Sequence, residues 1–167
     1  ALAEFDSLLH SAIGSITNSI LSDIQWLQAG LPIKLGGLGV RRVASLAIPA
    51  FLASAASTLP LQDAILSQAT CSSDSYFAPI LNAWSASFGS LLPPGAPLPS
   101  QQSFWDRPGL LVDHAHVKCS MSDPLSKARF LAAAAPHSGD WLLALPITSY
   151  GLRLDDEAVR VAVALRL

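Results

Sequence analysis

Three basic side chains flank a cluster of glycines in the segment WLQAGLPIKLGGLGVRR, residues 26–42. The basic residues are Lys34, Arg41 and Arg42, and the glycines are Gly36, Gly37 and Gly39. A phosphate-binding loop follows a strand and has the pattern GxxxxGK[ST] or GxGxxG, whereas here the lysine precedes the glycines and we expect no strand before them. Because glycine adopts positive φ angles at little steric cost, the pattern predicts a turn. Either the turn is purely structural, or the three cations flank exposed backbone amides and contact a nucleic-acid backbone.

A second cluster of reactive types lies in DHAHVKC, residues 113–119, which contains Asp113, His114, His116 and Cys119. On a helix His116 and Cys119 share a face and His114 does not, so a common metal ion would require a non-helical backbone. We therefore expect ordinary polar residues on a helix, with no metal and no cofactor in this chain.

Other arrangements that support catalysis are missing from the sequence. It has many serines but no GxSxG motif and no convincing Ser/His/Asp set. The consecutive acids Asp155, Asp156 and Glu157 are typical of a helix start, where carboxylates bind free amides and favour the positive end of the helix dipole. No reaction can be written from these residues, and we predict a non-catalytic segment.

The composition is unusual for an independent soluble domain. Of 167 residues, 51% are hydrophobic and 13% are charged, where about a quarter charged is typical. This imbalance indicates that part of the surface is covered by another element. The net charge of −2 argues against a freestanding nucleic-acid-binding domain, although it permits a contact made within a larger protein.

The cellular context follows from what the chain does not contain. No stretch offers the roughly 20 apolar residues of a membrane-spanning helix, and the first residues include Glu4 and Asp6 where a signal peptide would be basic. Cys71 and Cys119 are far apart and form no CxxC motif. We expect an intracellular protein, nuclear or cytoplasmic, without a membrane partner.

The apolar pattern predicts an all-α fold, an irregular multi-helix bundle in two lobes. The first expected helix carries a stripe of apolar residues three and four positions apart. The stripe consists of Leu2, Phe5, Leu8, Leu9, Ile13, Ile16, Ile20 and Ile24. Trp26 and Leu27 extend it at the C-terminal end of the helix. Further helices are expected at 43–59, with a break near Ile48 and a restart at Pro49, and at 61–69 and 79–90. All four tryptophans are expected to be core anchors.

The proline-rich segment LLPPGAPLPS suggests how the lobes are divided. Four prolines and a glycine in residues 91–100 exclude a helix and predict an extended linker. We expect a thumb-like N-terminal lobe over 1–90, a linker over 91–102 and a C-terminal lobe over 103–167.

The C-terminal lobe should begin with a helix near Ser103 that breaks or restarts at Pro108 and continues through 112–119. Its later helices have clear start and stop signals. Ser122 or Asp123 should cap a helix that has Pro124 in its first turn, and Ser138 should cap a short helix that ends at Pro146. The last segment, 154–167, could be a strand because its valines alternate, but we favour a helix with Arg166 at its negative end.

Three blocks of the sequence together resemble the region after the polymerase core in reverse transcriptases of LINE-type (non-LTR) retrotransposons. The first block, residues 5–56, contains the pattern W.QA.LPI..GGLG.R of the thumb in such proteins. The others, residues 127–146 and 151–167, contain the patterns SG.WL.ALP and GL.L....R.AV.LRL of the linker beyond it. The blocks cover roughly half of the chain, and their order and spacing make the resemblance more specific than any one of them.

The resemblance implies a parent RNA-directed DNA polymerase in which this segment holds the template-primer duplex and connects the polymerase to a downstream domain. The sequence has no YxDD motif, so no catalytic residue transfers to any position. Lys34, Arg41 and Arg42 would contact duplex phosphates. The alternative is a small helical module that binds a partner protein through its apolar surface.

Overall fold

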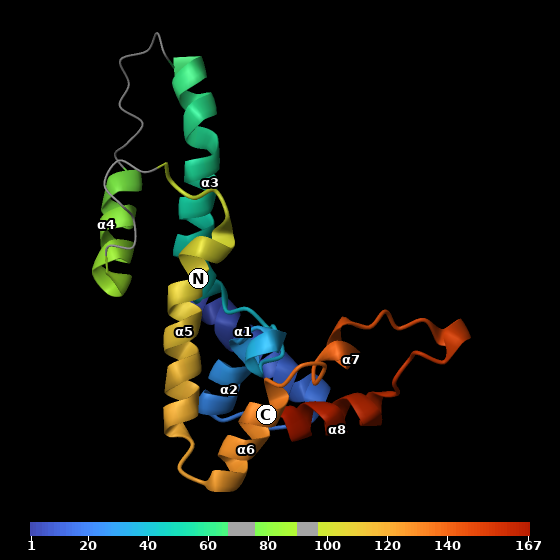
Figure 1. Ribbon diagram of the computed structural model, residues 1–167. Helices are drawn as coiled ribbons and strands as arrows, with labels where there is room; N and C mark the ends of the chain where they lie inside the picture. Colours follow the sequence, from blue (N-terminus) through green and yellow to red (C-terminus); the bar gives the residue numbers. More distant parts are fainter. Residues whose placement is uncertain (67–75, 90–96) are drawn as a thin grey trace. The chain divides into compact units, whose positions relative to one another are not determined.

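The computed structural model describes residues 1–66, 76–89 and 97–167, which are mostly helical and contain no strand (Figure 1). The all-α prediction is confirmed for this part of the chain. Two short 3-10 turns, η1 (Ile33–Leu35) and η3 (Thr148–Tyr150), accompany the α-helices. In chain order the helices are α1 (Leu2–Thr17), α2 (Asp23–Gly30), α3 (Val43–Leu66), α4 (Phe77–Phe88), α5 (Gln102–Ser120), α6 (Pro124–Ala133), α7 (Asp140–Leu143) and α8 (Asp156–Arg166).

The described chain divides into two compact units. Residues 1–44 and 111–167 form the first unit, and residues 45–110 form the second. This grouping differs from the predicted lobes 1–90 and 103–167, because α8 packs against both α1 and α6 and so brings the two ends of the chain into one unit. Residues 91–96 of the predicted linker 91–102 lie outside the described residues, and α5 already begins at Gln102, the last residue of that linker. The ends of two predicted helices, residues 67–69 and Ser90, also lie outside the described residues.

The predicted first helix is two helices. α1 ends at Thr17, where Asn18 adopts a left-handed conformation with φ 51°, a state that asparagine tolerates better than most residues. Ser22 and Gln25 then form a capping box that begins α2, in which each side chain satisfies a free backbone amide. The apolar stripe continues across this break, so periodicity could not reveal it.

Two prolines lie inside helices that we expected them to interrupt. α3 runs through Pro49 and α5 runs through Pro108, although an interior proline removes one backbone hydrogen bond and costs about 3 kcal/mol. Buried side chains on the same helices offset this cost: Leu52 follows Pro49 on α3, and Trp105 and Val117 flank Pro108 on α5. The predicted breaks at these prolines are therefore wrong.

The second unit has an aromatic core. Leu52 and Ala53 of α3 pack with Trp84 of α4 and Trp105 of α5. The Trp84 Nε1–H donates to the Trp105 carbonyl at 3.0 Å, and the Trp105 Nε1–H donates to the Pro99 carbonyl at 2.8 Å. Two of the four predicted anchors are thus fully buried, whereas Trp26 and Trp141 in the first unit are half-buried.

The helix starts in the C-terminal region are set by short polar side chains. The Asp123 carboxylate accepts from the Ser126 amide at 2.8 Å and caps α6, and the Asp155 carboxylate accepts from the Ala158 amide at 2.7 Å and caps α8. Residues 156–166 are helical, as we favoured over a strand. The predicted Ser138 cap is wrong, because α7 begins at Asp140 and the Ser138 hydroxyl donates backwards to the carbonyls of Ala133 and Ala135.

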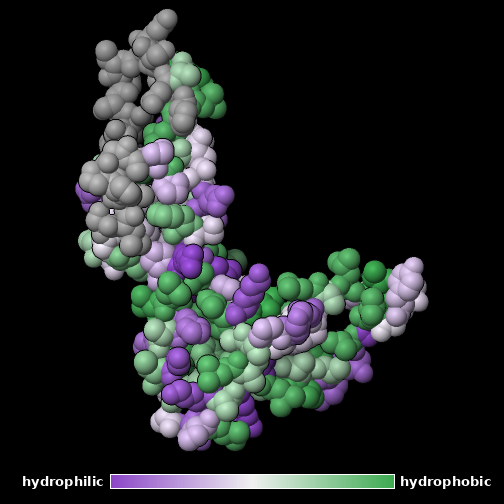
Figure 2. Space-filling view, viewed as in Figure 1, coloured by the Kyte–Doolittle hydropathy of each residue, from purple (hydrophilic) through white to green (hydrophobic). Residues whose placement is uncertain are grey.

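Two parts of the first unit expose apolar side chains. One is the outer side of α1, with Leu2, Phe5, Leu8 and Ile16. The other is the segment that leaves the helices after α7 and returns at α8, which Figure 2 shows with apolar residues on its surface. Its exposed apolar residues are Leu145, Ile147, Tyr150, Leu152 and Leu154, and Leu143 at the end of α7 is exposed as well. No helix within the described ranges is both long and apolar enough to span a membrane.

Candidate functional site

The glycine-rich segment forms a compact turn between α2 and α3. Gly36 and Gly39 have φ angles of 86° and 77°, which lie in the left-handed region that glycine adopts readily. Gly37 is required for a different reason. A Cβ atom at this position would collide with the carbonyl oxygens of Leu31 and Gln28, so the turn lies directly against the end of α2.

The backbone amides of this turn are occupied. Every N–H from Leu35 to Val40 donates to a carbonyl between residues 29 and 33, at distances from 2.8 to 3.2 Å. None of these six amides is free to bind a ligand, so the interpretation in which the basic residues flank exposed amides is wrong for residues 35–40. A phosphate here would have to be bound by side chains.

Arg166, at the end of α8, holds the turn in place. Its side chain is buried, with 6% of the residue exposed. The Nε–H donates to the Gly37 carbonyl at 2.8 Å, Nη2 donates to the Ile33 carbonyl at 2.7 Å, and Nη1 donates to the Ser138 carbonyl at 3.1 Å. Burial lowers the pKa of the guanidinium from its usual value, and the three carbonyl dipoles stabilise the charged form.

Gln28 completes this junction from the side of α2. Its side chain is buried, and Nε2 donates to the Arg166 carbonyl at 2.7 Å and to the Gly36 carbonyl at 3.2 Å. We call the set Gln28, Ile33, Gly36, Gly37, Ser138 and Arg166 the arginine junction. It connects the end of α2, the glycine turn, the residues before α7 and the end of α8.

Sequence reasoning placed Arg166 at the helix end, where it would interact with the helix dipole, and missed this role. Its carbonyl partners are backbone groups, which carry no residue-type signal, and two of them lie 129 and 133 positions away. The LRL pattern around Arg166 in the third block of the resemblance was the available signal.

The three basic residues of the turn differ in their surroundings. Lys34 lies on η1 with an exposed side chain, and Arg41 is half-buried. Arg42 forms an ion pair with Asp113 of α5, with 2.5 Å between Nη2 and Oδ2. Because this carboxylate balances the Arg42 charge, Lys34 has the side chain best placed to meet an anionic ligand.

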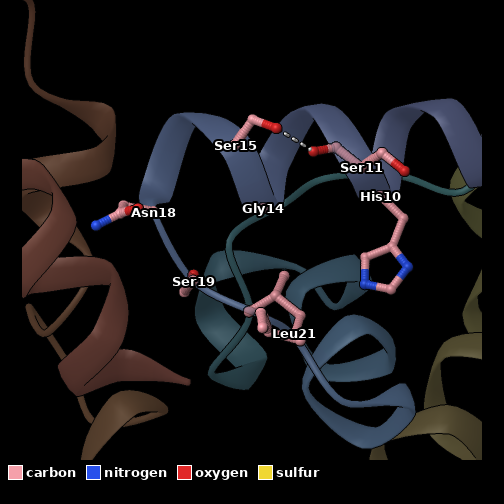
Figure 3. Close-up of a pocket in the computed structure, with 8 residues that line it drawn as sticks. His10, Ser11, Gly14, Ser15, Asn18, Ser19 and Leu21 are labelled. Atoms are coloured by element: carbon pink, nitrogen blue, oxygen red, sulfur yellow. Dashed lines mark hydrogen bonds between the residues drawn. The ribbon is translucent and has the colours of Figure 1, made fainter.

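A shallow groove beside α1 is lined by serine hydroxyl groups and the imidazole-bearing residue His10 (Figure 3). The Ser11 and Ser15 hydroxyls donate to backbone carbonyls one helical turn back, at 3.0 Å. The His10 ring is stacked on Trp26, with 4.7 Å between centroids. Among the residues described around this groove, no hydrogen bond joins His10 to a serine.

The residues of DHAHVKC lie on α5 and do not converge. His114 packs on the ring of Phe130, with 5.2 Å between centroids, Asp113 pairs with Arg42, and His116 and Cys119 are exposed. In the part of the chain that the structure describes, no three His, Cys, Asp or Glu side chains are close enough to share a metal ion; Cys71 lies outside that part.

Comparisons with known proteins add no assignment: no protein-family model, curated protein or solved structure matches the chain.

Proposed function

We propose that this chain is a non-catalytic thumb and linker segment of a LINE-type reverse transcriptase, and that it holds a template-primer duplex. The arginine junction is the observation that supports this proposal best. It draws Gln28 and the glycines from the first block of the resemblance, Ser138 from the second and Arg166 from the third. Three sequence blocks that occur together in such proteins thus depend on one another for their local structure.

In this proposal the junction orients Lys34. The lysine lies on η1 between Ile33 and Gly37, and Arg166 binds the carbonyls of both. A short turn fixed at its two ends restricts where the lysine side chain can reach. A cation held in this way would contact a duplex phosphate without regard to base sequence, and the contact would weaken as salt rises.

Arg42 has a smaller role in this proposal than the sequence suggested. The Asp113 carboxylate beside Arg42 would repel a phosphate, so the net attraction at that position is reduced. The Arg42–Asp113 pair is better suited to fixing the start of α3 against α5 within the first unit.

The test is a binding titration with the full chain and a fluorescein-labelled RNA–DNA hybrid duplex, repeated at several salt concentrations. Lys34→Ala should weaken binding and lower the slope of log K against log salt by up to about 0.9, the value for one phosphate contact. Lys127→Ala is the matched control, because Lys127 is exposed on α6 of the same unit. If the wild-type chain does not bind the duplex at low salt, or if the two variants behave alike, the proposal fails.

A second candidate is a helical module that binds a partner protein. The exposed apolar residues of α1, Leu2, Phe5, Leu8 and Ile16, favour it, because contiguous exposed apolar surface marks interaction sites. One observation distinguishes the two candidate functions. A reading frame that encodes a YxDD motif upstream of this segment would support the polymerase proposal, whereas a monodisperse chain from a frame without that motif would favour the module.

A further inference from the structure

A small cavity lies beside Lys34, between η1 and the turn that joins α6 to α7. Its volume is about 350 Å³, which is at the lower end of the range for small-molecule sites. Most of its lining is apolar. The lining includes Ile33 and Lys34 on one side and Ala135, His137, Ser138 and Asp140 on the other.

The arginine junction holds the two walls of this cavity together. Arg166 donates to the Ile33 carbonyl on one wall and to the Ser138 carbonyl on the other. Gly139 packs so closely on the Ile33 side chain that a Cβ atom at residue 139 would collide with Ile33 Cγ2. The walls are therefore fixed relative to each other before any ligand binds.

The wall that carries His137 is also held by its own hydrogen bonds. The Ser138 hydroxyl and the Ser138 amide both donate to the Ala135 carbonyl, and the Asp140 amide donates to the His137 carbonyl at 3.2 Å. His137 has a φ of 67°, a left-handed conformation that costs a non-glycine residue about 1 kcal/mol or more. Non-glycine residues held in such conformations are found preferentially at functional sites.

The rim of the cavity has charge on one side and a ring on the other. Lys34 lies on the η1 side of the cavity and His137 on the opposite side, and both side chains are exposed. The His137 Nδ1 lies 2.9 Å from the Asp140 Oδ2, and this hydrogen bond limits rotation of the ring. The Asp140 carboxylate repels phosphate, so a phosphate must approach from the Lys34 side.

We propose that this cavity binds one unpaired base of a nucleic acid strand, with the adjacent phosphate on Lys34 and the base against His137. The inference rests on the proposed function, because it concerns the same nucleic acid. Sites for single strands combine a cation that follows the backbone with a ring that stacks on a base. A fully paired duplex cannot place a base here, so the cavity distinguishes a duplex that carries a single-stranded overhang from a blunt one.

The experiment compares two RNA–DNA hybrids that differ by a four-nucleotide template overhang containing 2-aminopurine. The full chain should bind the hybrid with the overhang about fivefold to tenfold more tightly than the blunt hybrid, the lower end of the effect of one base–ring stack. Binding should also change the 2-aminopurine fluorescence, because a base that enters the cavity leaves its neighbours in the strand.

Two variants test the cavity itself. His137→Asn removes the ring but keeps a residue type that tolerates a positive φ, and Ala135→Phe fills the cavity. Each should bring the ratio of the two affinities close to one. The controls His116→Asn and Ala115→Phe change exposed residues of α5 and should leave the ratio as it is in the wild-type chain.

The outcomes separate this inference from the proposed function. Equal affinities for the two hybrids, with a Lys34-dependent salt slope, would overturn the base site and retain the duplex contact. A preference for the overhang that survives both cavity variants would also overturn it. If the chain binds neither hybrid, both proposals fail.

Discussion

Arg166→Met removes the centre of the arginine junction while keeping an unbranched, mostly apolar side chain. Three hydrogen bonds are lost, at 2.7, 2.8 and 3.1 Å, and hydrogen bonds from a charged group contribute about 1.5 to 3 kcal/mol each. Part of this is regained, because the folded chain no longer has to desolvate a guanidinium group that is paired with carbonyls instead of a carboxylate. We expect a net loss of about 3 kcal/mol in the free energy of unfolding, a large share of the 5 to 15 kcal/mol typical of a domain.

Urea unfolding monitored by circular dichroism gives the free energy, and hydrogen exchange monitored by mass spectrometry gives the local effect. The amides of residues 35–40 should exchange slowly in the wild-type chain and faster in the variant, because their turn loses its partner.

Arg160→Met is the control on the same helix. Arg160 is partly exposed, with an ion pair to Glu157 at 3.7 Å and a hydrogen bond to the Ile16 carbonyl at 3.3 Å, and should lose less than about 1 kcal/mol. A loss below about 1 kcal/mol for Arg166→Met, with these amides still protected, would refute the role assigned to the junction.

Further variants test other parts of the fold. Gly37→Ala should destabilise more than Gly39→Ala in urea unfolding, although Gly39 has the positive φ. A Cβ at 37 would collide with backbone carbonyls, whereas a Cβ at 39 would make only ordinary contacts with the Ile33 side chain. The reverse order would contradict the close packing of the turn on α2. The hydrogen bonds from Ser126 hold the pKa of the Asp123 carboxyl below its usual value of 3.8. The stability that this cap contributes is therefore present above pH 3.8 and is lost as the pH falls through the pKa of the folded state. Carboxyl NMR should find a titration midpoint below 3.8 for Asp123, and a midpoint at or above 3.8 would argue against the cap. Leu52→Ala should lower the free energy of unfolding by about 3 kcal/mol, because it leaves a cavity in the aromatic core. The control Phe51→Ala, at an exposed position of α3, should lower it by less than about 1 kcal/mol. Similar losses for the two variants in thermal or urea unfolding would mean that the core is placed wrongly.

Much of the helical architecture follows from the sequence, because the signals are local. The caps at Asp123 and Asp155 bind amides three residues away, and Pro124 follows its cap directly. Such interactions are readable within one helical turn. The same reasoning misplaced the start of α7, because Ser138 had backbone carbonyls nearby that compete for its hydroxyl.

The prolines show where local reasoning stops. The cost of Pro49 or Pro108 inside a helix is a local quantity, whereas the burial that offsets it depends on side chains from other helices. In the second unit, Leu52 is buried against Trp84 and Trp105. No window of sequence around Pro49 contains these partners.

For the candidate site, the residue types of WLQAGLPIKLGGLGVRR predicted a turn with three cations beside it, and the chain folds a turn there with Lys34 exposed. Glycine conformation and helix capping act over a few residues, so that turn and the helical state of its neighbours can be predicted from local sequence. Tertiary structure decided that the amides face inward, that Asp113 pairs with Arg42 and that Arg166 binds the turn from 129 positions away. These contacts join backbone groups and charges that are distant in sequence, and they form only when burial makes each unsatisfied polar group costly.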